Sequence, residues 1–108
     1  MITDYAEMSN EQLRLAITNK LYRKNGDLWE YKSSLGTFFA SDVPDYPNDL
    51  SEAMALKFGN YSLEITKRPN GKFLVTAYAD NDMVAEVEHS NPARAICIVW
   101  LNWERLTR

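Results

Sequence analysis

The sequence predicts an α+β fold in which helices pack on an antiparallel sheet of three to five strands. Three observations support this class: a capped helix begins near Asn10, alternating apolar segments follow one another after residue 60, and a strongly apolar helix begins at Pro92. Consecutive strands joined by short turns pair antiparallel, and helices bury their apolar faces against such a sheet. The expected order is α-β-α-β-β-β-α, in a helix–sheet–helix sandwich that forms a single domain over residues 1–108.

The first helix is expected over residues 10–24. Ser9 is a favourable N-cap, and Gln12 three residues later completes a capping box. An apolar stripe at helical spacing follows, made of Leu13, Ala16, Ile17 and Leu21. The pair Asn25-Gly26 is expected to end this helix.

Three segments separate the first helix from the second. Residues 28–32 alternate in polarity as a short strand does. Residues 33–43 fit either a second strand or a loop that packs its aromatic side chains. Residues 42–47 are expected to be extended, because Pro44 and Pro47 each disfavour helix in the residue before them.

A second helix and three strands are expected in the middle of the chain. The helix begins at Asn48 or Asp49, with Glu52 completing the cap signature, and it ends near Phe58 before Gly59. The strands are expected at residues 61–66, 73–78 and 83–88. Turns at Pro69-Asn70-Gly71 and Asn81-Asp82 separate them.

The last helix has the strongest local signals and is expected from Pro92 to about Leu106. Asn91 is an N-cap, and Pro92 occupies the first helical position, where proline is favoured. The apolar surface of this helix is wider than one stripe, which indicates burial on more than one side or a self-association face. In the second case a homodimer would form through Trp100, Trp103 and Leu106.

Two motifs resemble a known family. The segment from Pro44 to Leu50 (Pro-Asp-Tyr-Pro-Asn-Asp-Leu) leads into the second helix, and the last helix opens with Pro92 to Cys97 (Pro-Ala-Arg-Ala-Ile-Cys). Both are similar to motifs of the phage ABA sandwich domain family, and the resemblance covers roughly residues 10–101, with residues 33–42 outside the pattern. It implies a phage or prophage protein with a layered fold of helices and sheet, but no mechanism, because the family has no settled biochemical activity.

Composition and charge argue against several classes of protein. The chain of 108 residues is 45% hydrophobic and 25% charged, as an ordinary globular domain is. Its net charge of −3 does not suit a general nucleic-acid binder, which shows a basic face. No apolar run approaches the ~20 residues of a membrane span, and a single cysteine fits a reducing compartment. We therefore expect a cytoplasmic protein without membrane contact or direct nucleic-acid binding, and the family resemblance implies that this cytoplasm is that of a bacterial host.

No motif for catalysis, metal binding or a cofactor stands out. Nucleophilic catalysis needs a nucleophile beside a base, and the chain offers only Cys97 and His89. Cys97 is expected on a buried helix face as a small core residue, and His89 is expected to lead into the cap at Asn91. The glycines lie scattered at turns instead of gathering before a helix as a phosphate-binding loop requires. We expect no enzyme activity, no metal and no cofactor.

Acidic and aromatic side chains are the candidates for a partner-binding surface. Four acids between residues 42 and 52 have no Lys or Arg among them, and aromatic side chains crowd the same part of the chain. The predicted partner-binding residues are Trp29, Tyr31, Asp42, Asp45, Tyr46, Asp49 and Glu52. A second acidic set consists of Asp80, Asp82, Glu86 and Glu88, the last two on one strand face. Each acidic set fits either a solvated surface or a patch that docks on a basic surface, and each aromatic residue fits either core or interface.

The leading functional hypothesis is a small phage-derived binding protein that inhibits a host protein, such as a component of CRISPR interference or another bacterial defence system. One alternative is a binder or sponge of a signalling nucleotide. Aromatic rings would then stack on the base, and the phosphates would contact Lys67, Arg68, Lys72 or Arg94. Another alternative is a minor component of virion structure or assembly.

Overall fold

The computed structural model describes residues 4–33, 36–40, 43–56, 62–79 and 82–106. Its helices are α1 (Asn10–Leu21), α2 (Leu50–Met54) and α3 (Pro92–Leu106), with two short 3-10 helices, η1 (Tyr5–Glu7) and η2 (Tyr46–Asn48). Its strands are β1 (Tyr22–Asn25), β2 (Leu28–Ser33), β3 (Gly36–Ala40), β4 (Ser62–Lys67), β5 (Phe73–Ala79) and β6 (Asp82–His89). The strands form two antiparallel sheets of three strands each, in the orders β1-β2-β3 and β4-β5-β6.

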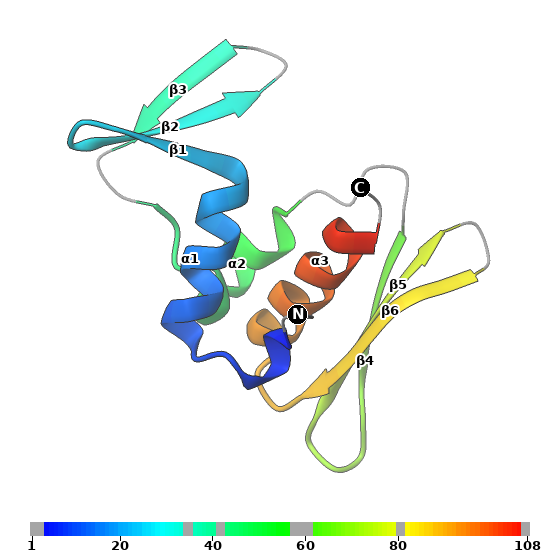
Figure 1. Cartoon of the computed structure of the whole chain (residues 1–108). Coiled ribbons are helices and arrows are strands. Elements are labelled where there is room, and N and C mark those ends of the chain that lie inside the picture. The colour runs from blue at the N-terminus through cyan, green and yellow to red at the C-terminus, as the bar shows by residue number, and fades with distance from the viewer. Residues whose placement is uncertain (1–3, 34–35, 41–42, 57–61, 80–81, 107–108) are drawn as a thin grey trace.

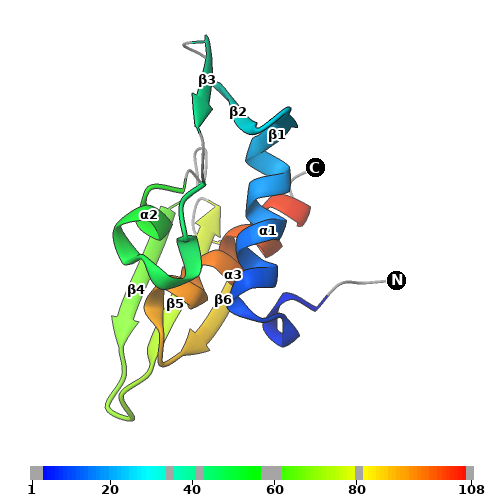
Figure 2. The ribbon, with the colours of Figure 1, turned by 90° about the vertical axis from the view of Figure 1, so that its left-hand side faces the viewer.

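The predicted α+β class, with helices packed on an antiparallel sheet, is confirmed. Helix α3 packs on β5 and β6 with one side, and on its other side it contacts α1, α2 and η2 (Figure 1). The layers therefore run from the β4–β6 sheet through α3 to α1 and α2, so all three helices lie on the same side of this sheet (Figure 2). The β1–β3 sheet projects beyond the end of α1, away from these layers (Figure 1).

The core lies between α3 and the β4–β6 sheet. Val75 and Ala77 of β5 and Ala85 of β6 are buried on the sheet side. Ile96 and Leu101 are fully buried on the helix side. Leu63 and Val87 pack against this cluster from the outer strands. A buried Leu or Ile side chain contributes about 1.5–3 kcal/mol through removal from water, so this interface stabilises the sheet and the last helix together.

Helix α3 is buried on more than one side, as its wide apolar surface predicts. Every residue from 95 to 101 is buried, including Trp100 at 4% exposure. The alternative was a homodimer through Trp100, Trp103 and Leu106. Trp100 is covered within the monomer, so it cannot contribute to such an interface. Trp103 is half-buried and packs against the core, while the side chain of Leu106 lies outside the description.

Helix α1 has the predicted cap but ends earlier than predicted. Ser9 Oγ accepts a hydrogen bond from the Gln12 N–H, and Gln12 Oε1 accepts one from the Ser9 N–H, as a capping box requires. The prediction of helix as far as residue 24 is wrong, because the chain turns extended at Tyr22 and pairs with β2. Asn25-Gly26 therefore opens a two-residue hairpin loop, in which Gly26 has a φ of 61°, a value that glycine adopts without strain.

The segments around α2 also differ from the expectation in part. Tyr46 and Pro47, expected to be extended, belong to η2, because the fixed φ of Pro47 suits a helical turn as well as an extended chain. Asp49 caps α2 as predicted, with its carboxylate accepting from the Glu52 N–H at 3.2 Å. The helix ends at Met54, four residues before the expected end, and Phe58 and Gly59 lie outside the described residues. Residues 36–40, which fitted either a strand or a loop, form β3.

The β4–β6 meander follows the prediction closely. Arg68 and Lys72 close the turn between β4 and β5 with a backbone hydrogen bond of 2.8 Å, and Gly71 has a φ of 83° within it. Among the described residues, no helix is both long enough and apolar enough to cross a membrane.

Candidate protein-binding surface

One face of the β4–β6 sheet points away from the helices. Side chains alternate between the two faces along each strand, so the register sorts them. The face away from α3 carries three cross-strand rows, namely Ser62–Tyr78–Met83, Glu64–Thr76–Glu86 and Thr66–Leu74–Glu88. Figure 1 shows α1, α2 and α3 on the other side of the sheet, so no helix among the described residues covers this face. We name it the outer sheet face.

The middle row of the outer sheet face places two carboxylates on either side of one hydroxyl. Thr76 lies on the central strand and is only 1% exposed, although none of the described helices lies over this face. Its neighbours in the row, Glu64 and Glu86, are both exposed. The Thr76 hydroxyl donates a hydrogen bond of 3.2 Å to Glu86 Oε2. A buried hydroxyl needs such a partner, and the bond also restrains the Glu86 carboxylate on the surface.

The third carboxylate of this face, on Glu88, has a basic partner. Arg68 Nε lies 3.1 Å from Glu88 Oε2, and the Asn70 amide donates to Glu88 Oε1 at 3.4 Å. Within the part of the chain that the structure describes, no ion pair involves Glu64 or Glu86. The negative charge of the outer sheet face is therefore concentrated on the middle row.

Apolar groups border the acidic row. Tyr78 and Leu74 flank Thr76 along β5 and are half-buried. Met83 at the far end is 58% exposed. An uncharged aromatic and apolar strip beside acidic side chains resembles the composition of protein–protein interfaces, where apolar contacts supply affinity and charges supply orientation.

The second acidic set of the sequence lies partly on this face. Glu86 and Glu88 project from the same face of β6, as predicted. Asp82 begins β6 and is exposed, whereas Asp80 lies outside the described residues. The acids predicted from the sequence did not include Glu64. Glu64 lies on the same face as Glu86 because β4 pairs with β5 so that Glu64 is opposite Thr76. The turn at residues 68–72 was a usable signal, because strands paired symmetrically about it place Glu64 opposite Thr76.

The predicted partner-binding residues do not form one surface. Tyr46 is only 5% exposed and belongs to the core, so it cannot serve as an exposed contact. Trp29 is half-buried on β2, next to the hairpin loop of the β1–β3 sheet, with the Lys24 ammonium 4.7 Å from its ring centre. The structure does not describe Asp42 or the side chain of Tyr31.

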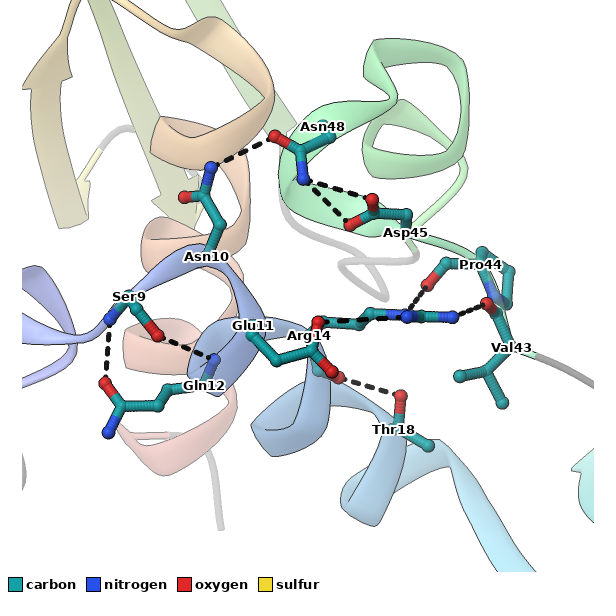
Figure 3. Close-up of polar contacts among 10 residues, drawn as sticks. All are labelled: Ser9, Asn10, Glu11, Gln12, Arg14, Thr18, Val43, Pro44, Asp45 and Asn48. Atoms are coloured by element: carbon teal, nitrogen blue, oxygen red, sulfur yellow. Dashed lines mark hydrogen bonds and ion pairs between the residues drawn. The ribbon is translucent and has the colours of Figure 1, made fainter.

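The acids near α2 have structural partners instead. Asp45 accepts two hydrogen bonds from the Asn48 amide, at 3.2 and 3.0 Å. Asn48 in turn accepts from the Asn10 amide at 3.0 Å, which links η2 to the start of α1 (Figure 3). Asp49 caps α2, and Glu52 lies half-buried one turn further. Asp45 and Asp49 remain exposed, but their carboxylates already stabilise local turns.

An arginine attaches the segment before η2 to α1. Arg14 donates from one guanidinium nitrogen to the Val43 carbonyl at 2.6 Å and from another to the Pro44 carbonyl at 3.3 Å (Figure 3). The planar fork of an arginine can satisfy two adjacent carbonyls at once. Glu11 Oε2 lies 3.8 Å from the same guanidinium as an exposed partner. Arg14 therefore positions residues 43–44 and is not a surface cation.

The basic residues predicted for phosphate contacts lie far from the predicted aromatic contacts. Lys67, Arg68 and Lys72 surround the β4–β5 turn, at the opposite end of the molecule from the β1–β2 hairpin that carries Trp29 (Figure 1). Arg94 donates to the Asn10 side chain at 2.7 Å and to the carbonyls of residues 6 and 8. The predicted rings and cations therefore do not meet in one nucleotide site.

The pair that was weighed as a nucleophile and base has structural roles. Cys97 is completely buried, and this burial raises the pKa of its thiol to about 12. His89 Nδ1 accepts a hydrogen bond of 2.9 Å from the Asn91 N–H, and Asn91 caps α3 by accepting from the Arg94 N–H. Burial, followed by the nearby charges of Arg94 and Lys72, lowers the pKa of His89.

No group of three or more His, Cys, Asp or Glu side chains lies close enough to hold a metal ion among the described residues. Comparisons of the chain with protein-family models, with curated proteins and with solved structures find no match.

Proposed function

We propose that this chain is a non-catalytic binding protein that docks on a basic protein surface through its outer sheet face. The observation that carries the proposal is the middle row of that face, where Glu64 and Glu86 stand on either side of Thr76 without a described basic partner. Complementary charges steer association and fix the orientation of a complex. The half-buried Tyr78 and Leu74 supply the apolar contacts beside them.

The partner class comes from the resemblance to the phage ABA sandwich domain family. A phage or prophage protein acts inside a bacterial host, so a host protein is the partner to test first. CRISPR effectors, one class of bacterial defence protein, hold nucleic acid in a positively charged channel. An acidic surface that occupies such a channel would exclude the nucleic acid and inhibit the defence system.

The proposal can be tested with a charge-neutralised face and a matched control. Glu64→Gln with Glu86→Gln removes two charges from the outer sheet face at constant size. Glu7→Gln with Glu11→Gln removes two charges from exposed positions on η1 and α1, beyond α3 from the sheet. Affinity capture from host lysate identifies the partner, and a binding measurement with the purified partner then compares the variants. The control pair should bind like the wild type, whereas the sheet pair should bind at least roughly tenfold more weakly.

Protection of a plated phage against a host that carries a defence system gives the functional readout. The wild-type chain and the control pair should raise plating efficiency, and the sheet pair should not. Recovery of no specific partner by the wild-type chain, or equal binding by both charge-neutralised variants, would contradict the proposal.

A further inference from the structure

The strand β4 forms an open edge of the β4–β6 sheet. It pairs with β5 on one side, and no strand among the described residues pairs with its other side (Figure 2). Its pairing with β5 is regular from Ser62 to Lys67, whereas Val84 interrupts the register of β6 at the opposite edge. A regular edge strand presents a row of backbone N–H and C=O groups to which another strand can bind.

The hairpin register identifies the backbone groups of β4 that point towards the open side. The Arg68 N–H donates to the Lys72 carbonyl at 2.8 Å, so these residues form a hydrogen-bonded pair. Hydrogen-bonded and non-hydrogen-bonded pairs alternate along antiparallel strands, so residues 64 and 66 bond to β5. The backbone groups that point towards the open edge belong to the three residues between and beside them, Leu63, Ile65 and Lys67.

The side chains at this edge leave apolar surface in water. Helix α3 packs on β5 and β6, and Val75 on β5 is fully buried. Ile65, the partner of Val75 on β4, faces the same side of the sheet and is 37% exposed. Native proteins often protect an edge strand with a proline or a bulge, and β4 has neither. The edge therefore offers both free backbone groups and an apolar side chain.

A second copy of β4 matches this edge. Two copies of one strand related by a two-fold axis run antiparallel, and each face of one sheet continues into the same face of the other. When the axis passes through Ile65, that residue pairs with its own counterpart, and Leu63 pairs with Lys67 of the second copy. This register uses all three residues that point outwards, and it places the two Ile65 side chains next to each other on the face towards α3.

Charge favours the same register. With the axis through Glu64, the two carboxylates would lie directly opposite each other, in a pair whose Cα atoms are about 4.5 Å apart. Like charges in that position are destabilising. With the axis through Ile65, Thr66 of the second copy lies opposite Glu64, and the two carboxylates are separated to a diagonal. Arg68 of the second copy then occupies the other diagonal beside Glu64, so the edge is complementary to itself.

We propose that this chain forms a symmetric homodimer in which two β4 strands pair antiparallel about Ile65 and join the two sheets into one. The interface uses the sheet edge and no residue of α3, so it differs from the dimer predicted through Trp100, Trp103 and Leu106. The outer sheet faces of the two copies lie side by side in this dimer. Self-association needs no host partner, so it holds or fails independently of the proposed docking function.

Sedimentation of the purified chain over a range of concentrations measures self-association. We expect the mass to rise from one copy to two as the concentration increases, and to stop there, because a two-fold pairing of one edge is closed. A mass of one copy up to about 1 mM would overturn the proposal, since a Kd above that value corresponds to less than about 4 kcal/mol of binding free energy. Growth beyond two copies would also overturn it.

Hydrogen exchange of the wild-type chain locates the interface. The amides of Leu63, Ile65 and Lys67 should exchange at least roughly tenfold more slowly in the dimer than in dilute solution. The amides of Glu64 and Thr66 bond to β5 and should be protected in both. A dimer without this alternation would overturn the pairing of β4. Protection that appears only when a host protein is added to a monomeric chain would also overturn it, and would assign the edge to a strand of that protein.

Paired variants test whether residue 65 meets its own counterpart. Ile65→Lys places two like charges on the axis and should weaken self-association at least roughly tenfold. Met83→Lys introduces the same side chain at a 58% exposed position on β6, at the opposite edge of the sheet, and should leave self-association unchanged.

Charge reversal at the axis gives the sharpest test of symmetry. Ile65→Lys and Ile65→Glu should each stay monomeric alone, and an equimolar mixture of the two should form a heterodimer, because opposite charges then meet on the axis. Circular dichroism of each variant checks that the fold is retained. Wild-type self-association by Ile65→Lys, or a mixture that stays monomeric, would overturn the proposal.

Discussion

The Thr76 hydroxyl donates to the Glu86 carboxylate across the boundary between β5 and β6, on the face of the sheet that no described helix covers. The donor is buried and the acceptor is exposed, so the bond connects the interior of the sheet to its surface. Glu64 stands on the other side of the same threonine. This row gives the molecule a negative surface whose position is set by strand register.

Neutralising this row should change binding without changing folding. Glu64 and Glu86 are exposed, and a glutamine at position 86 keeps an oxygen that can accept the Thr76 hydrogen bond, so the free energy of unfolding should change by less than about 0.5 kcal/mol. We expect Glu64→Gln with Glu86→Gln to unfold in urea within that margin of the wild type. A larger loss of stability would mean that the carboxylates support the fold, and a loss of partner binding could then not be assigned to the surface.

Salt dependence gives a second measure of the same surface. Raising the ionic strength from about 0.01 M to about 1 M shortens the screening length from about 30 Å to about 3 Å. Association of the wild-type chain with its partner should slow over this range, and the sheet variant should show little further change. An association rate of the wild type that does not depend on salt would contradict electrostatic docking.

Arg94 should contribute more to stability than Arg68. Its guanidinium donates to the side chain of Asn10 and to the carbonyls of Ala6 and Met8, which connects α3 to the start of the described chain. Hydrogen bonds from a charged group are worth about 1.5–3 kcal/mol in net terms, so Arg94→Met should lower the free energy of unfolding by about that much. Arg68→Met removes an exposed ion pair and should cost less than about 1 kcal/mol. Urea denaturation distinguishes the two, and equal costs would contradict the structural role of Arg94.

His89 should titrate below its ordinary value of 6.5. Burial, then the charges of Arg94 and Lys72, lowers its pKa, and the hydrogen bond from Asn91 to Nδ1 needs that nitrogen unprotonated. The stability that this group contributes is present above pH 6.5 and is lost as pH falls through the lowered pKa, because the unfolded chain binds the proton first.

Proton NMR of the His89 ring measures its titration midpoint directly. Lys72→Gln should raise that midpoint towards 6.5, whereas Lys67→Gln, two strands away in the same row, should move it less. A His89 titration midpoint at or above 6.5 in the wild type would contradict the burial of this ring.

Cys97 should react only when the chain unfolds. With a pKa of about 12, its thiol is ionised to about one part in ten thousand near pH 8, and it is completely buried. Iodoacetamide should leave the native protein unmodified for hours and should label it at a rate that follows the unfolded fraction in urea. Rapid labelling in the absence of urea would indicate local opening of α3 at Cys97.

The sequence predicted the elements whose signals are local. Pro92 at a first helical position and the turn at Pro69-Asn70-Gly71 both act within a few residues, so α3 and the β4–β5 hairpin follow from them. The strand β1 did not follow, because Tyr22 to Asn25 continues the helical segment without a clear break. Pairing with β2 decides the conformation of these residues, and strand preference depends on such context.

The sequence could predict the outer sheet face only in part. The alternation of Glu86 and Glu88 predicted a shared face, but the place of Glu86 beside Thr76 depends on a register that shifts near Ala77 and Tyr78.

The order of the elements along the chain has a consequence for biosynthesis. The central layer of the molecule, α3, comes last in the sequence, yet it packs against β5 and β6 on one side and against α1 and α2 on the other. A nascent chain that has not yet reached residue 92 therefore exposes Val75, Ala77 and Leu13 to water with nothing to bury them. We expect the fold to close in one late step after α3 leaves the ribosome, so premature termination before Pro92 should yield a product that proteases remove.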